Sequence, residues 1–495
     1  MIADLESLGP LGAEMARRAR AAGVMLIWRV QSRFVRSTMV RKGKTEGTSV
    51  TSSTGHGVQI VTDDGRTALA SRDDLRPEAA LTLLDRAVGV AARTKALRIT
   101  SGKLPPLQPL RDRAVPPGLE SFASIDLPEV GRRLVDLESR IAADVPRVQL
   151  RLHFRAELDA WRVFRDDGTD LLFAMPRCTM GMRATSVGDG ARHGVSSNVF
   201  SWRPDLPWDA PAVDCFLKRA RQSARLAAAL PDAPPHPAGS YPLVIDYALA
   251  KGLAHEAFGH AAEADGYRSS VLARDGRFRS GDEVGAAHIS IIDEPVPEDH
   301  AWQPFSVNGI PRERVTIVKD GRLVEGLSDL WSAESGGVRL TGAARAESFH
   351  LAPQPRMSNI RIETDAPLPA PGEFEDYGPE EVRDLLQSAG VFRRHPQVRF
   401  LSGYSGGQVN PTSGDFVFNC KAIYVLSEDG IAIHKPAIFS GSMFGALHSV
   451  REAFGPLKLD ALGHCGKWGQ SVPSSGGSHY FLVLDPDPTV RLGGS

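Results

Sequence analysis

The chain has 495 residues, of which 42% are hydrophobic and 24% charged, and its formal net charge is −1. A chain of this length exceeds one ordinary hydrophobic core, so we expect at least two domains. The balanced charge, without a block of Lys and Arg, argues against electrostatic binding to nucleic acid or to a membrane surface, and no segment has the roughly 20 consecutive apolar residues of a membrane span.

The first 30 residues place acidic side chains before basic ones and end in a short apolar run, which is the reverse of a secretory signal. The four cysteines are few and scattered, which favours reduced thiols over a disulfide framework. They are Cys178, Cys215, Cys420 and Cys465. We therefore expect a cytoplasmic protein.

The N-terminal half alternates between helix and strand patterns. Apolar spacing predicts a short helix around 11–22 and antiparallel strands over 25–74, which turn at Gly and Asp-Gly. A Pro-rich connector covers 104–117, and residues 146–202 return to a strand pattern with a turn at "RDDGTD". Three further segments have helical spacing: 77–97, 127–144 and 210–230.

The clearest boundary is "PDAPPHPAGS", residues 231–240, which is too rich in Pro for a helix or a central strand. After it we expect a buried strand at 241–246, a helix over 248–264, and then mostly strand and turn. Asp-Gly turns predict hairpins at 317–326 and 424–433. The fold class is α+β, with a mixed N-terminal α/β domain (1–235) followed by a β-rich C-terminal domain (236–495) that carries the candidate metal-site helix.

That helix contains "HEAFGH", with His255, Glu256 and His260. Zinc proteases space two helical histidines four residues apart, whereas a step of five turns the second imidazole about 140° away on an ideal helix. Gly259 is a natural place for a local π-turn, which would return His260 toward His255. The alternative is an amphipathic helix with ordinary surface or core histidines.

Catalytic zinc usually has three protein ligands, so a third donor is needed. Glu263 and Asp265 are near in sequence, Cys465 lies in a Gly-rich stretch, and His464 is a possible substitute. Cys465 ranks first. Cys178, Cys215 and Cys420 are interpreted as structural.

Four motifs resemble those of the TldD/PmbA family of metallopeptidases, and specifically its metal-bearing TldD-type subunit. They are "HEAFGHAAEAD", "GAARAESFHLAPQPRMSNI", "GYSGGQVNPTSGDFVF" and "CGKWGQSVPSSGG". The resemblance implies a zinc peptidase that binds one Zn²⁺ per chain through His255, His260 and Cys465, with Glu256 as catalytic base. It also implies a peptide substrate and a partner, either a metal-free paralogous subunit in a heterodimer or a second copy in a homodimer.

"GYSGG", residues 403–407, also matches the serine hydrolase motif G-x-S-x-G, but the Pro and Gly residues after it cannot start the required helix. In the family this stretch lies near the active site. We therefore expect Gly403, Ser405, Gly406 and Gly407 to bind a substrate backbone through main-chain hydrogen bonds.

Two departures from the family pattern concern the substrate. Ala261, Ala262 and Ala264 stand where glycines are typical, and 268–308 is atypical. Glu347, Arg356 and Asn359 lie in a family motif but have no mechanism that follows from sequence.

Three functions remain open. The first is a zinc-dependent peptidase acting on flexible or unfolded peptides. The second is a specialised metallo-hydrolase that trims a peptide or amide intermediate in a maturation or biosynthetic pathway. The third is a non-catalytic subunit of a TldD/PmbA-like complex, which Glu256 argues against because a scaffold needs no general base. Iron or cobalt would bind similar donors.

Overall fold

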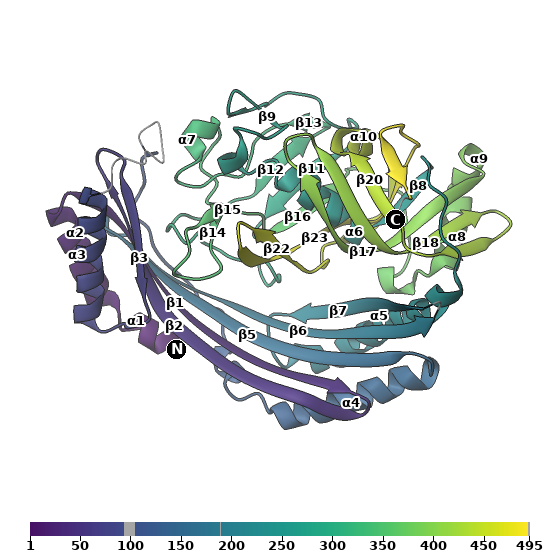
Figure 1. Cartoon of the computed structure of the whole chain (residues 1–495), viewed down its shortest axis with the longest axis horizontal. Helices are drawn as coiled ribbons and strands as arrows, with labels where there is room; N and C mark the ends of the chain where they lie inside the picture. The colour runs from purple at the N-terminus through teal and green to yellow at the C-terminus, as the bar shows by residue number, and fades with distance from the viewer. Residues whose placement is uncertain (94–103, 189, 494–495) are drawn as a thin grey trace.

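The computed structural model describes residues 1–93, 104–188 and 190–493. It contains two large sheets, and Figure 1 shows the long curved sheet of the N-terminal half lying beneath the C-terminal half. The α+β prediction is confirmed. Strands β1–β7 belong to the first sheet and β8 begins the second, while the boundary at residues 235 and 236 stays a prediction.

The N-terminal sheet has the order β3-β2-β1-β5-β6-β4, with β7 paired to β6. Its strands are β1 (Val24–Arg41), β2 (Lys44–Thr62), β3 (Thr67–Arg72), β4 (Arg111–Ala114), β5 (Gln149–Arg165), β6 (Asp170–Gly188) and β7 (Ala191–Ser201). Strand β4 corrects one expectation, since the Pro-rich connector at 104–117 contains a strand that pairs in parallel with β6.

The hairpin between β1 and β2 turns at Lys42 and Gly43, whose φ angles are 53° and 69°. Both central residues of a type I′ turn need positive φ, which suits glycine. Glu138 accepts hydrogen bonds from both turn amides, at 2.8 and 2.7 Å, and so ties the hairpin to a covering helix.

Helices cover one face of this sheet. They are α1 (Ile2–Glu6), α2 (Gly9–Ala21), α3 (Pro77–Arg93), α4 (Leu127–Asp144) and α5 (Ala210–Ala229). The four helices expected here are confirmed, except that 94–97 of the second lie outside the described residues. In α4, Asp126 caps the first turn by accepting from the Glu129 amide, and Val130, Leu134, Leu137 and Ile141 are buried at helical spacing.

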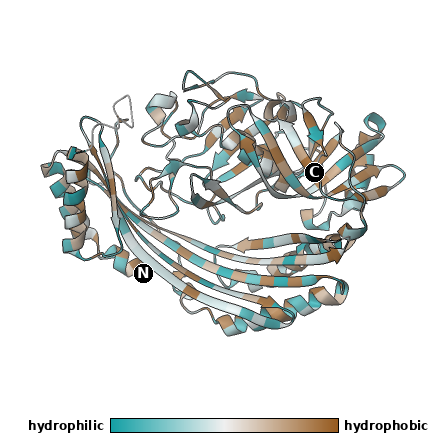
Figure 2. Cartoon of the chain, in the orientation of Figure 1, coloured by the Kyte–Doolittle hydropathy of each residue, from teal (hydrophilic) through white to brown (hydrophobic). Residues whose placement is uncertain are grey.

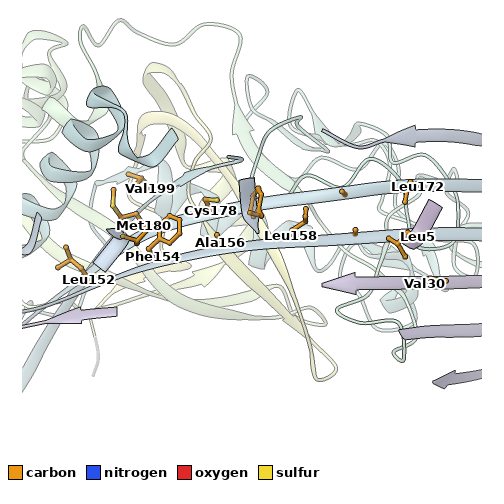
Figure 3. Packing of buried hydrophobic residues seen from close by; sticks show 14 of the residues in the cluster. Leu5, Val30, Leu152, Phe154, Ala156, Leu158, Leu172, Cys178, Met180 and Val199 are labelled. Atoms are coloured by element: carbon orange, nitrogen blue, oxygen red, sulfur yellow. The ribbon is translucent and has the colours of Figure 1, made fainter. Parts of the chain in front are cut away.

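Strand β5 presents different residues to its two sides because side chains alternate along a strand. Leu152, Phe154, Ala156 and Leu158 join the core with the helices (Figure 3). The intervening positions carry Arg151, His153, Arg155, Glu157 and Asp159. Figure 2 shows hydrophilic and hydrophobic residues interleaved along these long strands. The inner face of the sheet, toward the C-terminal half, is therefore polar along this stretch, whereas farther along β5 Trp161 and Val163 join an apolar cluster with residues of the C-terminal half.

The C-terminal sheet has the order β13-β12-β11-β16-β23-β8-β17-β18-β20-β24, with β19 on β18 and with β21 and β22 on β23. Its strands are β8 (Leu243–Asp246), β11 (Ser290–Glu294), β12 (Val315–Lys319), β13 (Arg322–Leu323), β16 (Asn359–Glu363), β17 (Gln397–Asn410), β18 (Asp415–Ser427), β19 (Ile431–His434), β20 (Ile438–Ser442), β21 (Val450–Lys458), β22 (Gly463–Lys467), β23 (Gln470–Leu484) and β24 (Val490–Leu492). Two small sheets pair β9 (Ala273–Arg274) with β10 (Arg277–Phe278) and β14 (Ala344–Arg345) with β15 (Gln354–Pro355). Both predicted Asp-Gly hairpins are confirmed.

The helices of this half are short. They are α6 (Tyr247–Gly252), a π-helix labelled η4 (Leu253–Gly259), α7 (Ala333–Gly336), α8 (Pro379–Ser388), α9 (Val391–Arg394) and α10 (Met443–His448). Short 3₁₀ turns are η1 (Leu119–Phe122), η2 (Leu206–Trp208), η3 (Leu230–Asp232), η5 (Ala264–Gly266) and η6 (Phe374–Asp376). The single helix expected over 248–264 is wrong in its length, because α-helical geometry ends at Gly252 and gives way to the π-turn. No helix among these described residues is long and apolar enough to cross a membrane.

Candidate metal centre

The end of strand β8 sets the position of the metal-site helix. Asp246 caps α6, because its Oδ1 accepts hydrogen bonds from the amides of Ala248 (3.1 Å) and Leu249 (2.9 Å). Its other oxygen accepts from the Gly403 amide at 2.5 Å. One buried carboxyl therefore fixes the helix against the glycine-rich part of β17.

The π-turn brings the two histidines together. The amide of His260 donates to the carbonyl of His255 at 3.1 Å, an i to i+5 bond. The two rings then lie 5.1 Å apart, centroid to centroid, at 88°. The predicted widening of the helix is confirmed. Gly259 is also required by packing, since a Cβ there would lie 1.9 Å from Sδ of Met357.

Cys465 reaches the same point from the β22–β23 hairpin. Its Sγ lies 3.3 Å from Nε2 of His260. The candidate ligand atoms of His255, His260 and Cys465 all lie within 4.8 Å of one another. Nδ1 of His255 is buried with no hydrogen-bond partner. An orphaned imidazole nitrogen beside a second imidazole and a thiol fits a Zn²⁺ ion, which prefers nitrogen and sulfur donors.

The other candidates for the third ligand lie outside this group. Glu263 Oε2 is 3.1 Å from Nδ1 of His260, on the side of the ring opposite Cys465. Asp265 binds Lys467 at 2.8 Å. His464 is exposed and packs its ring 5.6 Å from that of His300. Cys178 and Cys420 are buried and Cys215 is partly buried, and all four cysteines are free thiols.

A series of ion pairs lies on the side of the His260 ring away from Cys465. Lys467 Nζ is 2.8 Å from Glu263, which in turn contacts His260. Burial opposes ionisation of Glu263, but Lys467 and His260 lower its pKa to about 2. An ionised carboxylate at Nδ1 fixes the orientation of the ring and leaves Nε2 directed at the thiol of Cys465.

The charges also act on Cys465 itself. Burial opposes ionisation of the thiol, yet the neighbouring His260 lowers its pKa. Arg356 donates from Nη2 to the carbonyl oxygen of Cys465, while its Nε and Nη1 are buried without a hydrogen-bond partner. The site therefore favours a thiolate, the form that binds metals.

Glu256 lies beside the three candidate ligands. Its Oε2 is 3.8 Å from Nε2 of His260, and the hydroxyl of Tyr404 donates to its Oε1 at 3.3 Å. Burial raises the pKa of Glu256, which makes its carboxylate a stronger base than an exposed one. Nothing in the sequence indicated the role of Tyr404, although it lies within the quoted glycine-rich motif.

Gly403, Ser405, Gly406 and Gly407 lie on β17, where Gly403 and Gly406 have φ angles of 67° and 106° and the pairing with β18 contains a bulge. On the other edge of β17, pairing with β8 ends at Leu401. No described strand pairs with that edge beyond this residue. The segment runs as strand to Asn410, which confirms that the G-x-S-x-G match is not a nucleophile elbow.

Asn359 and Glu347, for which no mechanism followed from the sequence, hold the β22–β23 hairpin in place. Asn359 Nδ2 donates to the carbonyl of Leu459 (3.1 Å) and to Ser475 Oγ (3.2 Å), and Glu347 accepts from the Ser471 amide at 2.8 Å. Sequence reasoning missed these roles because each bond joins segments more than 99 positions apart.

The atypical segment 268–308 connects the site to the N-terminal sheet. Arg177 on β6 donates from Nε to the carbonyl of His300 at 2.8 Å. His300 in turn contacts His464, the neighbour of Cys465. The hairpin that carries Cys465 therefore lies over strands β5 and β6.

Comparisons with known proteins give sequence matches over the C-terminal half. Residues 238–475 match the family model for the PmbA/TldA metallopeptidase C-terminal domain. A metalloprotease from Archaeoglobus fulgidus is 32% identical over 291 residues, which cover 58% of this chain and 62% of the relative. A metalloprotease TldD homolog from Haemophilus influenzae is 29% identical over 294 residues, which cover 58% of this chain and 54% of the relative. The matches thus span little more than half the length of these relatives.

The fold has a counterpart along the whole chain. The crystal structure of TldE from Thermococcus kodakarensis superposes with a TM-score of 0.74 at 14% identity, covering 98% of this chain and 100% of that one. A match at this identity shows the shared fold alone. Through the family model over residues 238–475 and the sequence matches to metalloproteases, this chain belongs to the TldD/PmbA family.

Proposed function

We propose that the chain is a zinc-dependent peptidase of the TldD type that hydrolyses peptide bonds in flexible or unfolded peptides. His255, His260 and Cys465 would hold one Zn²⁺ and Glu256 would be the catalytic base. The observation that carries the proposal is the meeting of three ligand atoms within 4.8 Å beside the partly buried carboxyl group of Glu256.

When bound, Zn²⁺ supplies Lewis acidity toward the scissile carbonyl and lowers the pKa of a water molecule. Glu256 accepts a proton from the attacking water, whose oxygen forms a bond to the carbonyl carbon. As the C–N bond breaks, Glu256 returns that proton to the departing amine. Tyr404 holds the Glu256 carboxylate through Oε1, which leaves Oε2 to take part in the proton transfer.

The open edge of β17 supports a peptide substrate. An extended peptide can pair with a strand edge through main-chain hydrogen bonds that do not depend on its sequence. Gly403, Ser405, Gly406 and Gly407 are proposed to bind the substrate there, close to Tyr404 and therefore to Glu256. An unfolded chain can reach such an edge, whereas a folded one cannot.

The resemblance to TldE in fold supports a complex of two related chains. We propose either a heterodimer with a metal-free paralogue or a homodimer, located in the cytoplasm. Neither a nucleic acid nor a membrane partner is proposed.

The second candidate is a specialised metallo-hydrolase that trims a peptide or amide intermediate in a maturation or biosynthetic pathway. One observation favours it: the atypical segment 268–308 contributes His300, which contacts His464 beside Cys465. A narrow cleavage profile would identify this function.

The test is digestion of a mixed library of unstructured peptides, with and without the paralogue, read by mass spectrometry. General-base catalysis contributes about 10²–10⁴-fold to rate, so Glu256→Gln should abolish cleavage while retaining zinc. Glu380→Gln, which removes an exposed carboxylate on α8, is the matched control and should cleave normally. Equal cleavage by wild type and Glu256→Gln in zinc-loaded protein would contradict the proposal.

A further inference from the structure

A pocket of about 280 Å³ lies on the inner face of the N-terminal sheet, away from the candidate metal centre. Four strands contribute to it: β1, β5, β6 and β7. The lining residues are Met39, Arg151, His153, Met182, Arg183, Ser196, Ser197 and Asn198. His153 lies over Gly181, where a Cβ would come within 2.3 Å of the imidazole ring. The absence of a side chain at 181 therefore makes room for this ring.

The pocket lies on the same face of the N-terminal sheet as the Cys465 hairpin. The Cys465 hairpin lies over β5 and β6 near Glu157 and Arg177, which are opposite each other in the sheet. His153 is four residues from Glu157 on the same face of β5, a distance of about 13 Å at about 3.3 Å per residue. An extended peptide covers that distance with about four residues.

A second connection runs through Lys421 on β18. Its Nζ donates to the carbonyl of Ser196, a pocket residue, at 2.7 Å. Its side chain also packs against Gly403, where a Cβ would lie 2.5 Å from Cδ of Lys421. The pocket is thus joined to the segment of β17 that holds Tyr404 and, through it, Glu256.

The charges at the two ends of this face differ. Near the hairpin, Arg33 and Arg155 each bind Glu157. In the pocket, Arg183 is exposed, and its guanidinium makes no hydrogen bond or ion pair with another described residue. Arg151 is 3.7 Å from Glu46, and that carboxylate also pairs with Arg41. The pocket end therefore carries cationic groups in excess of anionic ones.

We propose that this pocket binds a carboxylate group of the peptide substrate, with Arg151 and Arg183 as the recognising side chains. Guanidinium groups bind carboxylates through paired, charge-assisted hydrogen bonds. The inference rests on the proposed peptidase function and narrows it to peptides with an acidic side chain or a free C-terminus.

The test measures binding separately from cleavage. Fluorescence anisotropy would follow labelled peptides of twelve residues on the full chain in the Glu256→Gln background. The four probes are a peptide with two glutamates, its glutamine counterpart, and the amidated form of each. Arg151→Gln with Arg183→Gln should weaken binding of the glutamate peptide about tenfold. Arg147→Gln with Arg268→Gln removes two exposed charges outside the pocket and should leave binding unchanged.

The probes separate the two sources of the carboxylate. If the glutamine peptide binds more weakly than the glutamate peptide, the pocket binds an acidic side chain. If the amidated peptides bind more weakly than the free acids, it binds the C-terminus. Either result supports the inference. Equal binding of all four probes would overturn the inference. An equal loss in the control pair, or stronger competition by a single-stranded oligonucleotide than by the glutamate peptide, would also overturn it. Arginine-dependent binding without cleavage by the wild type would refute the peptidase function and leave the pocket standing.

Discussion

Two clusters of charged, largely buried side chains differ in how completely their polar atoms are hydrogen-bonded. The bridging cluster, Arg219, Glu375, Lys458 and Asp460, joins α5 to the C-terminal half through contacts of 2.6 to 3.0 Å. The site cluster, His260, Glu263, Asp265 and Lys467, lies behind the candidate metal centre.

Orphaned polar atoms distinguish the two clusters. In the bridging cluster the orphan among described residues is Asp460 Oδ1. In and around the site cluster, Glu263 Oε1, His255 Nδ1, and Nε and Nη1 of Arg356 all lack partners. Burial of charge by itself therefore does not indicate a functional site. The site cluster differs in having several unpaired polar atoms gathered beside the candidate ligands, where each needs a partner, whereas single unpaired atoms also occur elsewhere among the described residues.

The largest effect should come from removing the thiol. Cys465→Ala is expected to lower zinc affinity about a thousandfold, since one of three protein donors is lost from a site whose binding energy is large. Titration against a chromophoric chelator measures it. Cys420→Ala is the matched control, because Cys420 is equally buried but distant from the ligand group, and it should keep the metal. Full retention of zinc by Cys465→Ala would move the third ligand to Glu263, Asp265 or His464.

Substitution in the bridging cluster should change the stability of the fold. Burial opposes ionisation of Glu375, but Arg219 and Lys458 lower its pKa from 4.5 to about 2. The group therefore stabilises the fold above about pH 4.5, and this contribution is lost as the pH falls toward 2. Glu375→Gln should lower the free energy of unfolding by about 3 kcal/mol at pH 7.

Urea unfolding at pH 7 and pH 3 tests whether the stabilisation by Glu375 is lost on acidification. The gap between wild type and Glu375→Gln should narrow at pH 3, and zinc affinity should stay unchanged at pH 7. The exposed Glu380→Gln should show no gap at either pH. If the difference in free energy of unfolding between wild type and Glu375→Gln is larger at pH 3 than at pH 7, the stabilising role of the Glu375 carboxylate is refuted.

Gly259→Ala probes the geometry of the π-turn. The added methyl group meets Met357 Sδ, and overpacking of this kind costs about 1–3 kcal/mol. Both the free energy of unfolding and zinc affinity should fall, because the displaced backbone carries His260. Gly266→Ala adds the same methyl group where nothing lies within 4 Å. If both variants unfold at the same urea concentration, the packing argument fails.

The smallest effect is expected from the carboxylate behind His260. Glu263→Gln retains a hydrogen-bonding oxygen but loses the charge, and such outer partners usually tune metal affinity by about 10–100-fold. We expect about tenfold weaker zinc binding, at the lower end of that range. Asp265→Asn removes the other anion bound to Lys467 without touching His260, so a larger loss in that variant would contradict this role for Glu263.

Patterns with a local cause could be predicted from the sequence. The helix over 127–144, the Asp-Gly hairpins and the π-turn at Gly259 all depend on neighbours within a few residues. Helix α8 has such a signal too, with Pro379 in its first turn and Glu381 accepting from the Gly378 amide at 2.8 Å, but it was not predicted.

The sequence near the candidate ligands did not indicate which charged groups surround them. Lys467 meets Glu263 across 204 positions and Arg356 meets Cys465 across 109. Such pairings arise only after β16, β22 and β23 have assembled. Spacing in the sequence therefore indicated the candidate ligands near the helix, whereas the groups that orient them appear only in the folded chain.

The separation of the candidate ligands also bears on biosynthesis. His260 and Cys465 are 205 positions apart, and ribosomes add about 5–20 residues per second. The histidines therefore enter the nascent chain about 10–40 s before the thiol does. Strand β23, the second strand of the Cys465 hairpin, lies between β16 and β8 in the sheet and is made later still. Binding of one metal ion by all three candidate donors must therefore wait until the Cys465 hairpin has been made and has joined the sheet.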